Sequence, residues 1–554
     1  MESNNINNII GIILIFGLFY LYMVLNKPSE EELAQKALQD SLARTEQIDS
    51  SKSVASNTTT ENTVALPDSM QKILNASKFG AFGESANGTE AIQTLENDKV
   101  RISFSNKGGV IKEVLLKDYK KKVFDENKEY ITSDVLLLED NKNRFDYILP
   151  VAGKGNINTG DLFFTPTIDG NTIRFKADAG NGRSFEQVYT LKDDYTLDYD
   201  INLNGLSGVL EGDTENIQLK WINYLDRIEN NKRFEKIYST TYYKEAEKNP
   251  NHCSCTGPDV EEPGERPIKW VSNVNQFFNS TIIADDYFAP STFETIVMDD
   301  EDNDMKKLIS TINIPIAEKN NIGMTMYVGP NEFDRLKAFD MDIEDVIPYG
   351  SSILGTINRW VIRPAFNGLR GLIGNMGITI LILTFLIKLV LYPLTYKMLH
   401  SQAKMGALKP ELAGLREKFK DDQQKIQMES MKIYREYGVN PAGGCMPMVI
   451  QMPIWIALYR FFPASIEFRQ QSFLWAQDLS SFDNFFNLPF DIPFVGAHIS
   501  LFTVLWVITQ LGYTFYMNSK LDMSGQMNPM FKYMQYFMPV MFFGFFNSYA
   551  SGLT

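Results

Sequence analysis

The sequence predicts a polytopic α-helical membrane protein that also has a large extracytoplasmic β-sandwich domain and a cytoplasmic helical hairpin. Apolar runs long enough to cross a bilayer lie near the N-terminus and after residue 375. Between them, apolar and polar residues alternate in short runs, which is typical of half-buried β-strands. The loop 397–445 between two apolar runs carries nine Lys and Arg residues, which favours the cytoplasmic side of a membrane.

The composition bounds the class of protein. The chain has 554 residues, of which 44% are hydrophobic, but its mean hydropathy of -0.19 is too low for a protein embedded in the membrane throughout. A net charge of -15 argues against a nucleic-acid-binding body. Three cysteines give no disulfide framework, and the cluster His252-Cys253-Ser-Cys255 lacks the further ligands of a metal site. A local disulfide or two free thiols are the alternatives for that cluster.

We predict five successive regions that differ in apolar content and periodicity. They are an N-terminal transmembrane anchor at 1–26, a flexible polar linker at 27–92, a β-sandwich domain at 93–345, an interfacial amphipathic helix at 346–375 and a membrane core at 376–554.

The anchor contains the apolar run Ile9 to Leu25, which follows a start without basic residues. An uncleaved anchor is therefore favoured over a signal peptide. The linker has too few apolar residues to offset its ordering entropy, and we expect at most a helix near Glu30 to Leu42.

The region 93–345 contains many short alternating runs, such as Val100 to Phe104 and Tyr195 to Leu203, separated by turn signals. This pattern predicts a β-sandwich. We find no glycine-rich phosphate loop and no nucleophile elbow. A domain that binds a partner or acts as a spacer is therefore favoured over an enzyme.

The stretch before the core is an amphipathic bridge. Its apolar stripe and its cations are Ile353, Ile357, Trp360, Val361 and Leu369 with Arg359, Arg363 and Arg370. A helix that lies in the membrane interface fits this pattern better than a buried core helix, because a spanning segment follows directly.

The core is expected to cross the membrane with several helices. The apolar runs lie at about 376–396, 446–462, 495–516 and 534–550. The loop 463–494 carries only Arg469 as a basic residue, so it is expected to be external, opposite to the basic loop 397–445. The β-domain, which precedes the first of these runs, is then external as well.

The cytoplasmic loop predicts two antiparallel helices. Apolar residues recur at helical spacing from Met405 to Phe419 and again from Ile426 to Tyr437, with a polar turn at Lys420-Asp-Asp-Gln between them.

One charge, Lys388, interrupts the first run of the core. At 1.5 Å per residue it lies roughly 16 Å from Gly377 and roughly 12 Å from Tyr396, close to mid-membrane. A cation at that depth costs about 2.5–3.5 kcal/mol on insertion scales. Lys388 could reach a headgroup, pair with a carboxylate in another helix, or face a wet cavity. Because the other apolar spans contain no Asp or Glu, we favour the wet cavity.

Several stretches resemble the YidC-type family of membrane protein insertases in its Gram-negative form. Tyr437-Gly-Val-Asn-Pro-Ala-Gly-Gly-Cys-Met-Pro with the following Gln451-Met-Pro is similar to the family's most specific motif, and Leu383 to Thr395, with its Tyr-Pro-Leu-Thr ending, resembles its first core helix. Asn528-Pro-Met and Ser551-Gly-Leu resemble the region of the last helices. Lys107-Gly-Gly-Val-Ile, Trp270-Val-Ser-Asn and Tyr327-Val-Gly-Pro-Asn-Glu-Phe resemble strands of the family's periplasmic domain.

The resemblance implies an inner-membrane insertase and chaperone whose five-helix core holds a hydrophilic groove, open to cytoplasm and lipid and closed externally. It implies nascent membrane proteins, the ribosome, the Sec translocon and the lipid bilayer as partners, and no catalytic residue, cofactor or metal. The family's groove cation is usually Arg at the position of Lys388, and a further spanning helix is expected beyond Ser551-Gly-Leu, so the chain to Thr554 lacks it.

The next polar candidates for the groove are Gln451 and Gln510. Each could instead form a hydrogen bond between helices, which is the commoner role.

Two other classes of function compete. A solute transporter or channel often shows inverted repeats, and no internal repeat is visible among these spans. An intramembrane protease needs an acidic or nucleophilic constellation, and the spans hold no Asp or Glu and only His498.

Overall fold

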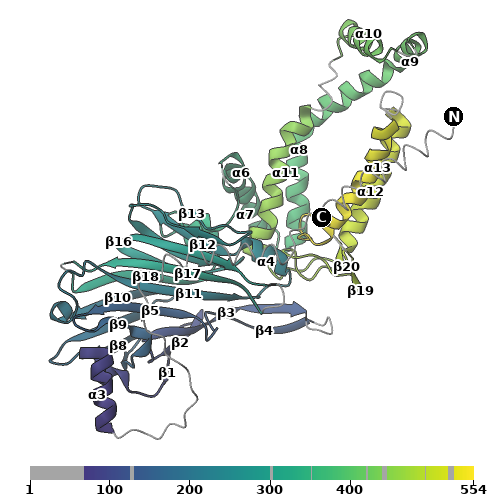
Figure 1. Ribbon diagram of the computed structural model, residues 1–554. Coiled ribbons are helices and arrows are strands. Elements are labelled where there is room, and N and C mark those ends of the chain that lie inside the picture. Colours follow the sequence, from purple (N-terminus) through teal and green to yellow (C-terminus); the bar gives the residue numbers. More distant parts are fainter. Residues whose placement is uncertain are drawn as a thin grey trace. The chain divides into compact units, whose positions relative to one another are not determined.

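The β-rich region is built from one large antiparallel sheet and one smaller sheet (Figure 1). The structure is a computed structural model that describes residues 68–124, 130–299, 303–317, 319–350, 352–419, 422–439, 446–492, 495–521 and 529–554. The predicted anchor and the predicted helix near residues 30–42 lie outside the described residues. The described residues belong to one unit, Asp68–Gln526 with Gln535–Thr554, except for residues 529–534, which belong to a second.

The smaller sheet has four strands in the order β1-β2-β3-β4. They are β1 Ile92–Glu96, β2 Val100–Ser105, β3 Val110–Phe124 and β4 Tyr130–Leu137. The alternation predicted for β2 is present, because Val100, Ile102 and Phe104 are buried while Arg101 is exposed.

The larger sheet has fourteen strands, and its main path runs β6-β5-β11-β17-β16-β18-β10-β9-β8-β7, with β12 to β15 attached at its side. The strands are β5 Arg144–Val151, β6 Gly155–Asn158, β7 Thr165–Asp169, β8 Thr172–Asp178, β9 Ser184–Leu191, β10 Thr196–Asn204, β11 Asn216–Asp226, β12 Thr240–Glu245, β13 Asn251–His252, β14 Asp259–Glu261, β15 Ile268–Val274, β16 Phe278–Val297, β17 Asp304–Pro315 and β18 Asn321–Pro330.

The large sheet curls on itself around a common core. The hydroxyl groups of Tyr147 on β5 and Tyr199 on β10 are 2.6 Å apart, although four strands separate β5 from β10 along the sheet. The ring of Phe104, on the smaller sheet, lies 5.0 Å from that of Tyr189 on β9. The predicted β-rich domain is therefore confirmed, and its two sheets share one hydrophobic core.

The polar stretch before β1 differs from the prediction of a flexible linker through residue 92. Helix α3, Asp68–Phe79, and the 3-10 helix η1, Gly80–Ala86, precede the first strand. Phe79 and Phe82 are buried in the domain core, and the amide of Phe163 donates a hydrogen bond to the carbonyl of Ser85. Two aromatic side chains are enough to anchor a segment whose average composition is polar.

Short helices lie between strands of the β-domain and, after β18, between that domain and the core. They are η2 Thr159–Asp161, η3 Leu206–Gly208, α4 Lys232–Tyr238, α5 Phe333–Lys337, η4 Ile343–Val346, α6 Ser352–Ile357, the π-helical η5 Asn358–Ile362 and α7 Arg363–Leu372. The last three confirm a helix within the predicted amphipathic bridge. Asn358 ties it to the core, because its amide donates to the carbonyls of Tyr349 and Ala457.

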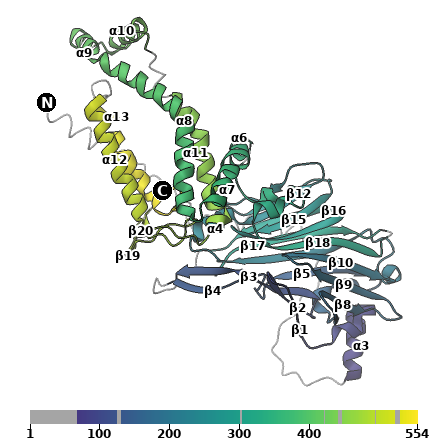
Figure 2. The ribbon, with the colours of Figure 1, turned by 180° about the vertical axis from the view of Figure 1, so that it is seen from behind.

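All four predicted runs of the core are helical, namely α8 Met376–Ala407, α11 Met446–Ala464, α12 Leu501–Leu521 and α13 Pro529–Asn547. Among the described helices only α8 is long and apolar enough to count as a membrane span by length and hydropathy. Helices α8 and α11 run side by side, as do α12 and α13 (Figures 1 and 2).

The predicted run 495–516 begins too early. Strands β19, Phe486–Ile492, and β20, Gly496–Ile499, pair with each other, and α12 starts only at Leu501. The cause is capping, because the Asp483 carboxylate accepts the amides of Leu501 and Phe502 and the Ser500 hydroxyl accepts that of Thr503.

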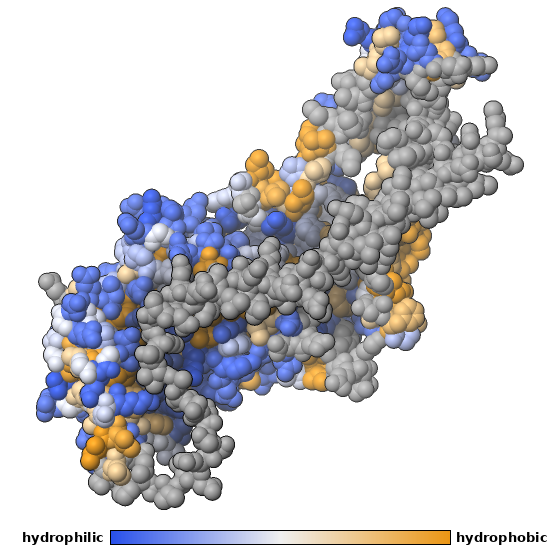
Figure 3. Space-filling model, viewed as in Figure 1, coloured by the Kyte–Doolittle hydropathy of each residue, from blue (hydrophilic) through white to orange (hydrophobic). Residues whose placement is uncertain are grey.

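The predicted hairpin is present as α9, Lys409–Lys418, and α10, Gln423–Glu436. Leu408, Leu412 and Val439 form its small core. Asp422 caps α10 by accepting the amide of Lys425 at 3.1 Å. In Figure 3 hydrophilic residues dominate the visible surface of both the β-domain and this hairpin.

Candidate substrate groove of the membrane core

Lys388 lies in the middle of α8, and its side chain is exposed. Asn375 starts the helix by accepting the amide of Ile378 at 3.1 Å. In the part of the chain that the structure describes, no ion pair or hydrogen bond involves the Lys388 ammonium group. Pro393 removes one intrahelical hydrogen bond just beyond Lys388, which favours a bend there.

Lys388 shares a face of α8 with two threonines. Thr384 precedes it by one helical turn, and Thr395 follows it by two turns. The Gln451 amide on α11 donates to the Thr395 hydroxyl at 3.4 Å. The structure thus brings Gln451 to the same face of α8 as Lys388, and it gives Gln451 the interhelical hydrogen bond that the sequence left as one alternative.

Gln510 lies on a different polar stripe. Thr503, Gln510, Thr514 and Asn518 recur on one side of α12. The Thr503 hydroxyl donates to the carbonyl of Phe546, and the Asn518 amide donates to the side chains of Gln535 and Tyr536. This stripe faces α13, and no contact among the described residues joins Gln510 to Lys388 or Gln451.

The helices of the core are tightly packed at the end next to the β-domain. On α8, Met376, Thr379 and Leu383 are buried, whereas Phe385 and Val390 are 65% and 77% exposed. Gly377 permits a close approach, because a Cβ there would overlap the ring of Phe473. On α8, burial of the side chains therefore ends at Leu383, five residues before Lys388.

Aromatic rings fill the closed end. The ring of Phe366 on α7 lies 5.7 Å from Phe461 and 4.8 Å from Phe468. Tyr459 stacks on Tyr549, just beyond α13, at 4.5 Å. These contacts join α7, α11 and the end of α13 in one apolar plug.

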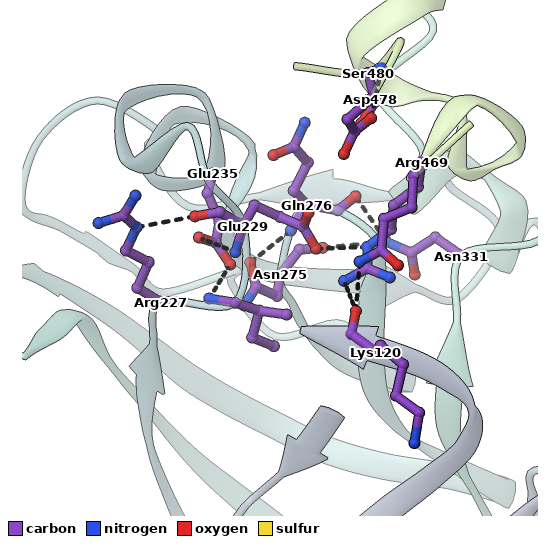
Figure 4. A network of polar contacts seen from close by, with 12 residues as sticks. Lys120, Arg227, Glu229, Glu235, Asn275, Gln276, Asn331, Arg469, Asp478 and Ser480 are labelled. Atoms are coloured by element: carbon purple, nitrogen blue, oxygen red, sulfur yellow. Dashed lines mark hydrogen bonds and ion pairs between the residues drawn. The ribbon is translucent and has the colours of Figure 1, made fainter. Parts of the chain in front are cut away.

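A buried ion pair ties this closed end to the β-domain. Arg469, on the loop after α11, places its Nε 2.7 Å from the carboxylate of Glu229, and the two side chains are only 3% and 8% exposed. The same guanidinium donates to the carbonyl of Lys120 on β3 at 2.7 Å. Figure 4 shows Arg469 pointing into a group of β-domain residues.

Further polar contacts cross the same junction. The Gln276 amide donates to the carbonyl of Pro463 at 2.7 Å. The Asn331 side-chain amide in turn donates to the carbonyl of Gln276 at 3.2 Å (Figure 4). The Asn231 amide donates to the carbonyl of Ser548 at 2.9 Å. The ends of α11 and α13 are therefore both held by the β-domain.

A second carboxyl group lies next to Glu229. Both oxygens of Glu235 accept backbone amides, from Ile228 at 2.8 Å and from Glu229 at 2.9 Å. Burial, together with the nearby Glu229 carboxylate, raises the pKa of Glu235 to about 8. Burial also raises the pKa of Glu229, and the neighbouring Arg469 guanidinium partly offsets that rise.

Elsewhere the described residues offer little for catalysis or metal binding. The carboxylates of Asp140, Asp226 and Asp304 lie close together, but the ammonium of Lys142 pairs with both Asp140 and Asp304. Cys253 and Cys255 are free thiols, which decides between the two alternatives for that cluster.

Sequence reasoning missed the Arg469 junction. The available signal was that Arg469 is the single basic residue in the loop 463–494, set beside Ile466 and Phe468. A single cation next to an aromatic residue indicates a buried ion pair, but its partner Glu229 is 240 residues away in the sequence.

Comparison with known proteins decides the family. The chain matches the family described as 60Kd inner membrane protein over residues 368–554 and the YidC periplasmic domain over residues 93–363. It is 36% identical to the membrane protein insertase YidC of Parabacteroides distasonis, over 99% of this chain and 89% of that protein. It is 34% identical to the same protein of Phocaeicola vulgatus, over 99% of this chain and 88% of that one. The chain belongs to the YidC family of membrane protein insertases.

As a YidC family member, the chain is an inner-membrane protein with a periplasmic domain, and the family is not one of enzymes. The resemblance stated from the sequence motifs is confirmed. The transporter, channel and protease alternatives are set aside.

Proposed function

We propose that this member of the YidC family takes nascent transmembrane segments into a hydrophilic groove beside Lys388 and releases them sideways into the inner membrane. The observation that carries the proposal is the position of Lys388. It is an exposed cation without a described partner, in the middle of an apolar helix, five residues beyond Leu383, the last buried side chain on that stretch of α8. A lone cation at mid-membrane depth is tolerated when it faces water or a passing charge.

We assign Lys388 the role of attracting acidic side chains of a segment in transit. Its ammonium keeps the charge of the family's usual Arg but not the planar fork, so attraction does not depend on bidentate geometry. Gln451 borders the same face of α8. Gln510, on the polar stripe of α12, is proposed as a further polar residue of the groove.

We also propose the topology that the loop charges indicate. Residues 27–350 are periplasmic and the loop 397–445 is cytoplasmic, with α9 and α10 as a cytoplasmic hairpin. The two halves of the curled sheet then act as the layers of a periplasmic β-sandwich. The packed aromatic end of the core closes the groove on the periplasmic side.

Nascent membrane proteins are the proposed clients, and the ribosome and the Sec translocon are proposed partners. The mixed charge of the exposed hairpin supports a docking role on the cytoplasmic side. No covalent chemistry is needed, because a wet groove lowers the barrier for carrying a polar segment through hydrocarbon.

The test is insertion by the purified full chain. In proteoliposomes, we expect it to insert a small ribosome-bound membrane protein, measured as protection of the translocated tail from added protease. Liposomes without the chain provide the baseline. Equal protection in both, with the chain correctly folded, would contradict the proposed function.

A further inference from the structure

A polar cavity lies where the β-domain, helix α7 and the loop after α11 meet. Its volume is about 530 Å³, and its wall is rich in charged side chains from β3, α5, α7 and residues 466–471. This is a different place from the face of α8 that carries Lys388.

Most charges in the wall are already paired. Asp118 is 2.7 Å from Lys99, and Glu332 is 3.0 Å from Arg335. Asp334 pairs with Arg363, and Arg469 pairs with Glu229.

Three charged groups in the wall are left over. Lys122, Arg370 and Glu467 have no ion pair in the part of the chain that the structure describes. The burial of Glu467 raises the pKa of its carboxyl. The cavity therefore offers two cations and one carboxyl group to a ligand.

The position of the cavity indicates whether its ligand comes from the membrane or from solution. Arg370 lies six residues before α8 begins, and Glu467 lies three residues after α11 ends. With the topology proposed above, on which this inference rests, both are at the periplasmic membrane surface. Leu372, the last residue of α7, is 85% exposed, which provides an apolar surface for an acyl chain.

We propose that this cavity binds the headgroup of a zwitterionic phospholipid that carries a primary ammonium group. The phosphate is held by Lys122 and Arg370, because guanidinium and ammonium groups are strong phosphate donors. The ligand's ammonium is held by Glu467. An anionic headgroup would leave Glu467 facing a negative charge, and a quaternary ammonium cannot donate a hydrogen bond to it.

The test measures lipids retained by the purified full chain from an equimolar mixture of phosphatidylethanolamine, phosphatidylcholine and phosphatidylglycerol, by mass spectrometry. We expect retention of phosphatidylethanolamine over the other two by about tenfold, the size of one hydrogen bond to a charged group. Lys122→Gln and Arg370→Gln should each remove most of that preference. Glu467→Gln should shift the preference toward phosphatidylglycerol. Lys154→Gln, an exposed lysine in the turn after β5, is the matched control and should change nothing.

Retention without headgroup preference, or a preference that all three cavity variants leave intact, would overturn the proposal. Soluble glycerophosphoethanolamine and inorganic phosphate are tested in parallel, and binding as tight as that of the lipid would assign the cavity to a soluble phosphate compound instead. Thermal unfolding of each variant shows whether it has folded. Because no client is present, a failure of insertion activity would leave this result unaffected.

Discussion

Insertion of a client segment that carries an acidic residue falls by about tenfold when Lys388 is replaced by leucine. Two unit charges 4 Å apart attract by about 1 kcal/mol in water and about 4 kcal/mol at an effective dielectric constant of 20, and a wet groove lies between these limits. A loss of about 1.4 kcal/mol corresponds to the tenfold change. Insertion of the same segment with the acidic residue replaced by its amide should change little. Protease protection in proteoliposomes measures both.

Two further variants make the result specific to the position of the charge. Lys388→Arg should retain insertion, because the charge is kept and a fork geometry is not required. Lys397→Leu removes another exposed lysine of α8, toward the hairpin, and should affect the two clients equally. If Lys388→Leu also reduced both clients equally, Lys388 would be a structural cation and the attraction argument would be wrong.

Replacing Arg469 by methionine should lower the free energy of unfolding by about 3–5 kcal/mol, because it leaves the Glu229 carboxylate buried without its partner. The carbonyl of Lys120 loses a donor as well. Chemical unfolding of the purified chain, followed by tryptophan fluorescence, provides the measurement.

A double-mutant cycle separates the pair from the rest of the junction. The double variant Arg469→Met with Glu229→Met should recover most of the loss, because an apolar pair does not need the compensation that a lone buried charge needs. Arg174, whose side chain is 48% exposed, pairs with Glu186 at 2.8 Å and is the control. Arg174→Met should cost about 1 kcal/mol or less. Additive losses in the cycle would show that the Arg469 contact carries no coupling between loop and β-domain.

Local patterns in the sequence predicted the elements where a single period dominates. The alternation in β2 and β10 and the helical spacing on both sides of Asp422 are local properties, and the structure has the corresponding strands and helices. The predicted boundaries of elements were wrong where a contact with a residue distant in the sequence determines them. The start of α12 depends on the carboxylate of Asp483, and the order of η1 depends on the burial of Phe82 in the β-domain.

The candidate site follows the same division. One charge in an apolar run was enough to select Lys388. The contact of Gln451 with Thr395 depends on how α11 packs against α8, and the pairing of Arg469 with Glu229 depends on how the loop meets the β-domain. Neither packing is encoded in a local pattern, so neither contact could be predicted from the sequence.

The most direct test of the central claim is site-specific photo-crosslinking on α8 with ribosome-bound nascent chains. A crosslinker at position 384 lies on the face of Lys388, and one at position 390 lies roughly on the opposite face, because two residues turn an α-helix by about 200°. We predict crosslinks to the nascent segment from position 384 that weaken with Lys388→Ala and persist with Lys388→Arg, and few from position 390. Equal crosslinking from both positions, or crosslinks from position 390 alone, would contradict a groove beside Lys388.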